Sequence, residues 1–361
     1  MRLRAPMGLS GLSTWIPPER QSAREAVELG LIEEETAEEL GYDRLPVADV
    51  SAPEMAVLAG RAALEAAGEG PTGLVLHSWM HYQGHDLWSA PHYIADQLGL
   101  GDAVPLGIQQ VCNGGAAAVE TAIARLLAEP ALGRALVTTA DRFAEPGFDR
   151  WRGDYGIAYG DGATALVVHP LDRDTGTGSG TGSGTGEGAG GSADLALYAI
   201  ATVAAPALER MHRGGDPFSA AARSISSRVD LRRTKKAFLA AEGMEAFTRA
   251  SGERLRRVVR TCLADAGLDA ADPRLRYAVM PRLGRKTIDL AYRPAISELT
   301  PAEILATGRE TGHLGAGDAA AGLAELHHDK MLEPGERALV ISAGAGFTWS
   351  CLLVGKAEPA G

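Results

Sequence analysis

The sequence predicts an α/β protein built from two similar halves. Three observations support this: strand and helix signals alternate along the chain, one stretch near the middle is echoed near the end, and the composition is rich in small residues. Apolar residues make up 45% of the 361 residues, aromatic residues 5%, and there are 45 glycines. Such a composition is typical of a compact enzyme with closely packed small side chains.

The strand and helix signals follow one another in order. Short apolar runs that suit buried strands occur at 73–78, 104–111, 134–141, 163–169 and 277–280, and again in the closing runs RALVISAG and FTWSCLLVG. Helical spacing of apolar residues predicts helices at 91–100, 113–129, 244–267 and 317–332. The regular alternation favours layers of helix packed on sheet.

The pattern of residues 116–140 is repeated in residues 319–343. In each copy a helix of small residues precedes a proline and then a buried strand, RALVTTA in the first and RALVISA in the second. Arg134 corresponds to Arg337, an offset of 203 residues (337 − 134). A repeat of this length predicts two pseudo-symmetric α/β halves, 1–172 and 195–361. Between them, 173–194 is a Gly/Ser/Thr-rich insertion of the kind that forms a flexible surface segment.

Charge and hydrophobicity exclude several classes of function. The formal net charge is −11, which disfavours a general nucleic-acid binder. No apolar run has the length of a membrane-spanning helix, and the N-terminus lacks the apolar stretch of an export signal, so we expect a cytoplasmic protein without membrane contact. The basic run 249–260 could meet an acidic partner.

Cys112 is the candidate nucleophile. It lies between the predicted strand GIQQV and the helix that begins NGGAAAVETA. A thiolate at a strand-to-helix turn faces the positive end of the helix dipole, and small residues after it allow a substrate to approach. A buried core cysteine is the alternative reading. Cys262 and Cys351, in the middle of a predicted helix and strand, are interpreted as core residues.

The sequence resembles ketoacyl-acyl-carrier-protein synthase III, a thiolase-fold enzyme. The resemblance rests on QQVCNGGAAAVETAIA around Cys112, on RALVTTADRF and YGDGATALVV, and on TGHLGAGDAAAGLAEL and SAGAGFTWSCLLV near the end. It implies a thiolase-like fold whose two halves form a five-layer αβαβα architecture. It also implies a homodimer and an acyl donor carried on phosphopantetheine or coenzyme A, with no bound cofactor.

Two departures from that family change the expected chemistry. Condensing members carry a Pro-His-Gln-Ala-Asn run, where this chain has Pro281 followed by Arg282. Their Gly-Asn-Thr-Ser run is replaced here by one that contains His313, and Asp318 follows five residues later. Decarboxylation needs two neutral donors on a thioester carbonyl. The run GHLGAGD instead resembles a motif of synthase-III-like acyltransferases from antibiotic pathways.

The sequence therefore suggests acyl transfer without condensation. Cys112 would carry the acyl group, His313 would deprotonate an alcohol or amine of a natural-product scaffold, and Asp318 would orient the ring, unless it only caps the next helix. A condensing synthase without the usual His, or a non-catalytic partner subunit of a synthase, are the alternatives.

The resemblance suggests further site residues. It implies an oxyanion hole formed by the backbone N–H groups of Cys112 and Ala345. The position before Pro91 is Ala90, where the synthases carry a bulky aromatic, so a roomier acyl pocket is expected, with Trp88 beside it. Such a pocket would accept a branched or aromatic group, including an aromatic polyketide acyl.

An acidic acyl carrier protein or carrier domain is the expected partner, and the basic run is its expected dock. The positions singled out are 253, 256, 257 and 260, of which position 253 is Glu253 and carries no positive charge. The cationic candidates are Arg256, Arg257, Arg260, Arg282, Arg285 and Lys286. An ordinary solvated helix face is the alternative.

Four histidines and one aspartate receive structural interpretations. His77, His81, His85 and His92 lack an acidic metal-ligand set around them, so they are assigned to pocket lining or polar surface and no metal is expected. Asp161, in YGDGA, fits a tight turn entering a strand.

Overall fold

The computed structural model describes residues 1–171 and 193–356. One large mixed sheet runs through the molecule, in the order β10-β9-β11-β12-β8-β1-β7-β6-β4-β5. The strands of the first half are β1 (Arg2–Trp15), β4 (Thr72–Ser78), β5 (Val104–Ile108), β6 (Arg134–Asp141) and β7 (Gly162–Pro170). Those of the second half are β8 (Leu195–Ala204), β9 (Leu275–Val279), β10 (Glu303–Leu305), β11 (Arg337–Gly344) and β12 (Thr348–Gly355).

The two halves have the same topology. In the first half β1 pairs antiparallel with β7 and β7 with β6, while β6, β4 and β5 run parallel. In the second half β8 pairs antiparallel with β12 and β12 with β11, while β11, β9 and β10 run parallel. The antiparallel pair of β1 and β8 joins the halves. The pseudo-symmetry predicted from the repeat is confirmed, since Arg134 begins β6 and Arg337 begins β11.

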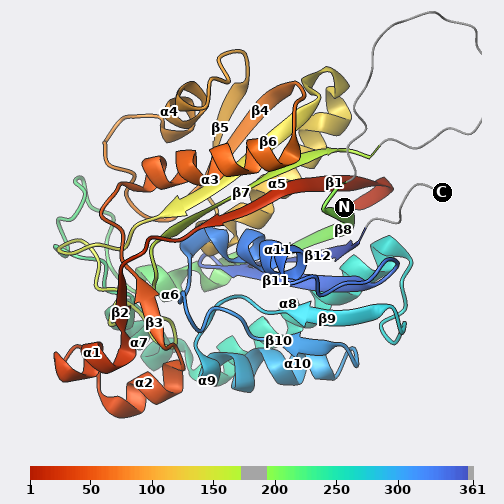
Figure 1. The fold of residues 1–361 in the computed structure, drawn as a ribbon. Coiled ribbons are helices and arrows are strands. Elements are labelled where there is room, and N and C mark those ends of the chain that lie inside the picture. The colour runs from red at the N-terminus through yellow and green to blue at the C-terminus, as the bar shows by residue number, and fades with distance from the viewer. Residues whose placement is uncertain (172–192, 357–361) are drawn as a thin grey trace, which may run out of the picture.

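Helices divide the strands into five layers, as Figure 1 shows. Helices α3 (Ala52–Ala67) and α4 (Ala90–Gln97) cover the outer face of the first half, and α8 (Met244–Ala266) and α10 (Arg293–Ser297) cover that of the second. Helices α5 (Gly114–Ala128) and α11 (Asp318–His328) lie between the two groups of strands. Three buried apolar clusters fill the spaces between these layers. This is the predicted αβαβα arrangement.

The central helices are packed through small side chains. Ala116, Ala118 and Ala122 of α5 share a buried cluster with Ala320 and Ala324 of α11. Alanine allows two helices and the sheets on either side to approach closely, which explains the small-residue composition. The N-termini of both helices are thereby brought to the same place.

The remaining elements lie outside the ten-stranded sheet and the layers of helix named above. They are β2 (Arg20–Ser22), α1 (Ala23–Glu28), α2 (Glu34–Leu40), β3 (Arg44–Pro46), α6 (Arg210–Arg213), α7 (Leu231–Glu242), α9 (Arg285–Thr287) and a π-helical turn Ile288–Tyr292. Short 3₁₀ turns occur at Val111–Asn113, Pro130–Leu132, Pro206–Glu209 and Gly315–Gly317. Within the described ranges, no helix is long and apolar enough to cross a membrane.

The predicted elements are present, with shifts at their ends. The strand expected at 104–111 ends at Ile108, because Val111 adopts a positive φ of 50° that no strand continues through. The helix expected at 317–332 ends at His328. The Gly/Ser/Thr-rich insertion lies outside the described residues except for Ala193 and Asp194. The long strand β1 was missed, because its sequence carries glycines and arginines among the apolar residues.

Candidate active site

Cys112 lies in the 3₁₀ turn Val111–Asn113, directly before α5. Val111 is β-branched and has a φ of 50°, a conformation that costs about 1–3 kcal/mol and is typical of functional turns. The turn lifts the thiol to the N-terminus of α5, where the helix dipole favours negative charge. Cys112 is 9% exposed, and its Sγ lies 3.7 Å from Sδ of Met80.

Glycines after Cys112 are required by close packing. A Cβ on Gly114 would lie 1.9 Å from Oγ of Ser78, and one on Gly115 would lie 2.5 Å from the carbonyl oxygen of Ala316. The second contact crosses from the first half of the chain to the second. Gly115 therefore sets the distance between the Cys112 turn and the 3₁₀ turn Gly315–Gly317 that precedes α11.

His313 and Asp318 form a buried pair at that second turn. Nδ1 of His313 lies 2.6 Å from Oδ2 of Asp318, and the two side chains are 1% and 2% exposed. Asp318 also accepts hydrogen bonds from the backbone N–H of Leu314 at 2.9 Å and of Arg282 at 2.8 Å. These donors fix the carboxylate, which in turn fixes the ring. Asp318 is also the first residue of α11, so it serves the helix N-terminus as well.

The other ring nitrogen of His313 faces the nucleophile. Nε2 is buried and has no nitrogen or oxygen partner within the described residues. Burial opposes the charged ring, but the charges of Asp318 and Cys112 and side-chain hydrogen bonds to both outweigh it, so the pKa of His313 is raised well above its usual value. The pKa of Asp318 is lowered: burial opposes this, while His313 and Arg282 favour the carboxylate. The structure thus brings Cys112, His313 and Asp318 together.

Arg282 does not lie where a docking residue must. Its side chain is 2% exposed, and it forms an ion pair with Glu325 at 2.8 Å and a hydrogen bond to Thr307 at 2.8 Å. Its carbonyl oxygen accepts a hydrogen bond from the buried Tyr42 hydroxyl. The prediction that Arg282 docks a carrier protein is therefore wrong, since a buried and paired guanidinium is not available to a partner.

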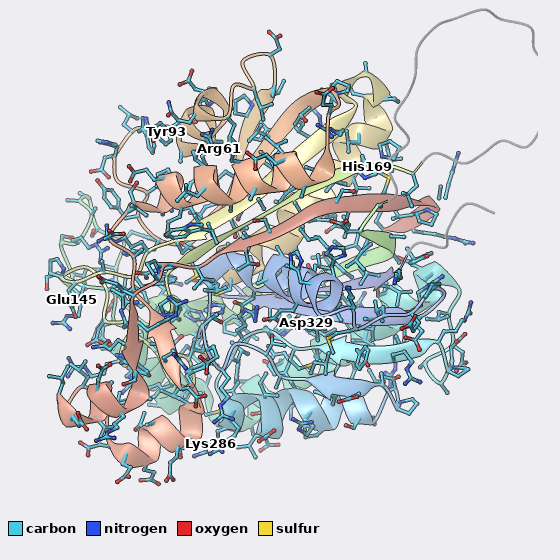
Figure 2. The ribbon with its side chains drawn as sticks, in the orientation of Figure 1. Arg61, Tyr93, Glu145, His169, Lys286 and Asp329 are labelled. Atoms are coloured by element: carbon cyan, nitrogen blue, oxygen red, sulfur yellow. The ribbon has the colours of Figure 1, made fainter. Side chains whose placement is uncertain are left out.

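The remaining docking candidates differ in their availability. Arg256 is paired with Glu298 at 2.7 Å. Lys286 is paired with Glu39 of α2, and Arg285 donates to the carbonyl of Glu38. Figure 2 shows Lys286 at the edge of the molecule beside α2 and α9. Of the positions singled out on α8, Arg257 and Arg260 are exposed, as is the acidic Glu253.

The turn Gly344–Phe347 lies against the Cys112 turn. A Cβ on Gly344 would lie 2.5 Å from the backbone nitrogen of Asn113, so the two backbones are in contact. Phe347 has a φ of 62°, a second strained non-glycine residue at the site. Ala345 lies within this turn and is partly exposed. The backbone oxyanion hole of Cys112 and Ala345 stays a prediction.

Ala90 and Trp88 lie at the N-terminal end of α4. Ala90 is buried in its first turn, whereas Trp88, in the preceding loop, is 41% exposed and its ring contacts those of His85 and Tyr93. The expectation that the two residues line the acyl pocket stays a prediction.

Sequence reasoning missed an aromatic cluster next to Cys112. Phe143, Phe148 and Tyr159 have ring centroids 4.8–4.9 Å apart, and Met80 packs against them. The Tyr159 ring meets His313 edge to face at 5.3 Å, and its hydroxyl donates to Asp154 at 3.1 Å. The motif YGDGA does not reveal that its tyrosine packs beside the site, because the residues that Tyr159 contacts there come from distant parts of the chain.

Asp141 was also missed. This fully buried carboxylate at the end of β6 accepts hydrogen bonds from the backbone N–H groups of Met80, His81 and Ala316. Burial raises the pKa of Asp141 to about 7, against the opposing effect of these donors and of the His313 charge. An aspartate at the end of a predicted buried strand is a sequence feature from which a buried carboxylate near the site could have been predicted.

The four clustered histidines diverge. His77 is fully buried, within reach of Thr138 and Gln83, and burial lowers its pKa to about 4. His81 packs on Phe143 and Phe148. His92 is exposed and bonds Ser89. The assignment to pocket lining or surface is wrong for His77, which is a satisfied core residue. In the described ranges, no group of three His, Cys, Asp or Glu side chains is placed to hold a metal.

The remaining structural interpretations are confirmed. Asp161 is fully buried, accepts from the backbone N–H groups of Ala48 and Phe143, and pairs with Arg150 at 3.1 Å. Cys262 and Cys351 are fully buried in the apolar cluster under α8. All three hold the fold rather than the site.

Comparisons with known proteins place the chain in one family. The family model of 3-oxoacyl-[acyl-carrier-protein] synthase III matches residues 106–182, and that of its C-terminal part matches residues 263–356. A β-ketoacyl-[acyl-carrier-protein] synthase III of Synechococcus sp. (strain WH7803) is 33% identical over 136 residues, which are 37% of this chain and 40% of that protein.

Solved structures extend the similarity over the whole chain. The acyltransferase ChlB3 has a TM-score of 0.82 and 32% identity, over 98% of this chain and 99% of its own. The synthase III FabH from Pseudomonas aeruginosa PAO1 has a TM-score of 0.72 and 19% identity, over 99% and 100%. At that identity the second match shows the fold alone. The chain belongs to the ketoacyl-acyl-carrier-protein synthase III family of thiolase-fold proteins.

Proposed function

We propose that this protein is an acyltransferase that moves an acyl group through a Cys112 thioester to an alcohol or amine, without decarboxylative condensation. The observation that carries the proposal is the buried His313–Asp318 pair beside Cys112, with the 2.6 Å contact between Nδ1 and Oδ2. A ring held by a carboxylate on one nitrogen and facing a nucleophile with the other is suited to proton transfer.

The reaction has two balanced steps. In the first, the Cys112 thiolate attacks the donor thioester carbonyl, and the carrier thiol leaves with a proton from the His313 imidazolium. In the second, Nε2 of His313 takes the proton of the acceptor hydroxyl or amine as it attacks the acyl-Cys112 carbonyl, and the Cys112 thiolate leaves. Backbone N–H groups of Cys112 and Ala345 would stabilise the oxyanion in both steps.

The surroundings of Arg282 argue against condensation. A condensing site needs neutral donors on the thioester carbonyl where carbanion charge develops. The Arg282 guanidinium is committed to Glu325 and Thr307. His313 donates to a carboxylate that increases its basicity, which suits a general base better than a neutral donor. The full-length similarity to the acyltransferase ChlB3 supports the same conclusion.

The acyl group is expected to be apolar and planar. Met80 touches the Cys112 sulfur, and the rings of Phe143, Phe148 and Tyr159 pack behind it. Aromatic side chains favour an aromatic guest through offset or edge-to-face packing. An aromatic polyketide acyl on a carrier protein or coenzyme A meets this description, with a small-molecule natural product as acceptor.

A homodimer is part of the proposal. Strand β5 is an edge of the large sheet, with Val104 42% exposed. The loop leading into the neighbouring α4 exposes Leu87 and Trp88. An unpaired edge next to exposed apolar residues favours pairing with a second copy. Light scattering of the purified protein measures this directly, and a monomer at micromolar concentration would oppose it.

The experiment that tests the function is intact-protein mass spectrometry with a panel of acyl thioesters. Wild type should gain the mass of one acyl group, Cys112→Ala should gain none, and an added alcohol or amine acceptor should remove the adduct. Release of carbon dioxide from a malonyl donor would favour a condensing synthase instead. An adduct that no acceptor removes, or no adduct with any donor, would favour a non-catalytic partner subunit.

Docking is tested separately on the exposed basic positions of α8. Arg257→Glu with Arg260→Glu should raise the KM for a carrier-bound donor far more than for a small thioester, because both side chains are exposed. Arg61→Glu is the control, since Arg61 is an exposed arginine on α3, outside the basic run. Equal effects on both donors would remove the docking idea.

A further inference from the structure

We propose that Asp141 is a positioning residue that holds the two halves of the active site in register. Its effect on turnover rests on the proposed function, whereas its effect on the geometry of the site does not. Asp141 ends β6 in the first half of the chain. Its carboxylate binds the backbone of one loop from each half, and each of these loops carries a side chain of the site.

The contacts divide between the two carboxylate oxygens. Oδ1 accepts from the backbone N–H of Met80 at 2.9 Å and of His81 at 2.8 Å, in the loop after β4. Oδ2 accepts from the backbone N–H of Ala316 at 3.0 Å, in the turn before α11. One side chain thus connects loops that are 235 residues apart in the sequence (316 − 81).

Each loop leads directly to a reacting group. Met80, whose N–H binds Oδ1, places its sulfur 3.7 Å from the Cys112 sulfur. Ala316, whose N–H binds Oδ2, lies between His313 and Asp318, and its carbonyl would lie 2.5 Å from a Cβ on Gly115. A shift of Ala316 therefore moves the His313 turn relative to the Cys112 turn. A misplacement of about 1 Å is enough to cost catalysis as much as 100-fold.

Only an acidic side chain meets these demands. The three N–H donors approach both oxygens of the carboxylate. An amide side chain has one oxygen and one NH₂ group, so it would face at least one of these donors with N–H groups of its own. Gly315 shows how closely the carboxylate is enclosed, since a Cβ there would lie 2.1 Å from Oδ2. In the described ranges no Lys or Arg side chain pairs with Asp141, so the backbone donors are its partners.

Asp194 provides a control. Its Oδ2 accepts the backbone N–H groups of Gly11 at 2.8 Å and Leu12 at 3.4 Å, so it also ties two distant segments together through backbone donors, β1 and the start of β8. It differs in that neither of these segments carries a residue of the site. An isosteric amide at Asp194 should therefore weaken a contact between the halves without misaligning His313 and Cys112.

The test is the rate of Cys112 alkylation by iodoacetamide, measured on the full chain at pH 8. Alkylation reports how His313 is placed against the thiol, and it requires neither acyl donor nor acceptor. The pKa of Asp141 is raised to about 7, so at pH 8 its carboxylate is ionised and can accept all three N–H groups. Asp141→Asn should react about 10-fold to 100-fold more slowly than wild type, at a rate close to that of His313→Gln. Asp194→Asn should react at the wild-type rate.

Two further outcomes are decisive. If Asp141→Asn does not fold, Gly315→Ala displaces the same carboxylate from the other side and should slow alkylation to the same degree. A folded Asp141→Asn or Gly315→Ala protein that is alkylated at the wild-type rate would overturn the inference. Slowed alkylation in these variants, together with a wild type that takes no acyl group from any thioester, would leave the positioning role standing and remove only the proposed acyl transfer.

Discussion

Asp318 holds His313 by a 2.6 Å contact between Oδ2 and Nδ1, across a five-residue turn at the N-terminus of α11. The same carboxylate accepts the backbone N–H groups of Leu314 and Arg282. Its orientation is thus set by the backbone rather than by the histidine. This makes the ring a fixed element of the site before any substrate arrives, and it determines what the following substitutions should do.

Asp318→Asn should reduce the rate of acyl transfer from Cys112 to the acceptor. The amide keeps the shape but cannot stabilise the imidazolium, and it permits the wrong tautomer, which costs about 10⁴-fold in a comparable triad. We expect a loss of about 10²–10⁴-fold in kcat with a smaller change in KM. Single-turnover decay of the acyl-Cys112 adduct, followed by mass spectrometry, measures this. Unchanged decay would exclude Asp318 from the mechanism.

The protonated His313 ring should stabilise the folded protein at low pH. Its pKa is raised in the folded state, so its contribution is fully present below the unfolded pKa, near 6.5, and is lost as pH rises through the folded value. The difference in unfolding free energy between wild type and His313→Gln should therefore shrink from pH 6 to pH 9. Urea denaturation at both pH values checks it. A difference that grows with pH would contradict the paired imidazolium.

Tyr159→Phe should have a smaller effect than Tyr159→Leu. The first removes the hydroxyl that donates to Asp154 at 3.1 Å, a loss of about 1 kcal/mol of stability, but keeps the ring against His313. The second also removes the edge-to-face contact at 5.3 Å and leaves space beside the acyl group. Thermal unfolding and kcat/KM for an aromatic donor separate the two. Equal losses of kcat/KM would assign the effect to the hydroxyl.

Arg282→Ala should destabilise the fold without affecting carrier binding. The guanidinium is buried and pairs with Glu325, whose side chain is 36% exposed, so its removal should cost about 2 kcal/mol, mainly through lost packing. Arg257→Ala, at an exposed position, should change stability by less than about 0.5 kcal/mol. Chemical denaturation gives both values. A stable Arg282→Ala protein with a raised KM for carrier-bound donor would restore Arg282 as a docking residue.

The architecture and the candidate reacting groups could be predicted from the sequence. The 203-residue offset between Arg134 and Arg337 reports a real duplication, because each copy must bury the same face against the same neighbours. Cys112 could be singled out from local chemistry, since a strand-to-helix turn followed by glycines is visible in a short window. His313 and Asp318 could be paired because they are close in sequence.

Which charged residues lie at the site and which lie in the core depends on packing between distant parts of the chain. Arg282 is one of several arginines in the sequence, and its burial against Glu325 depends on where α11 lies. Asp141 and Tyr159 contact the site through partners that are distant along the chain. Local sequence patterns show which side chains of a single helix or strand face the interior. The contacts between elements are set by packing of the two halves, and no short window of sequence contains that information.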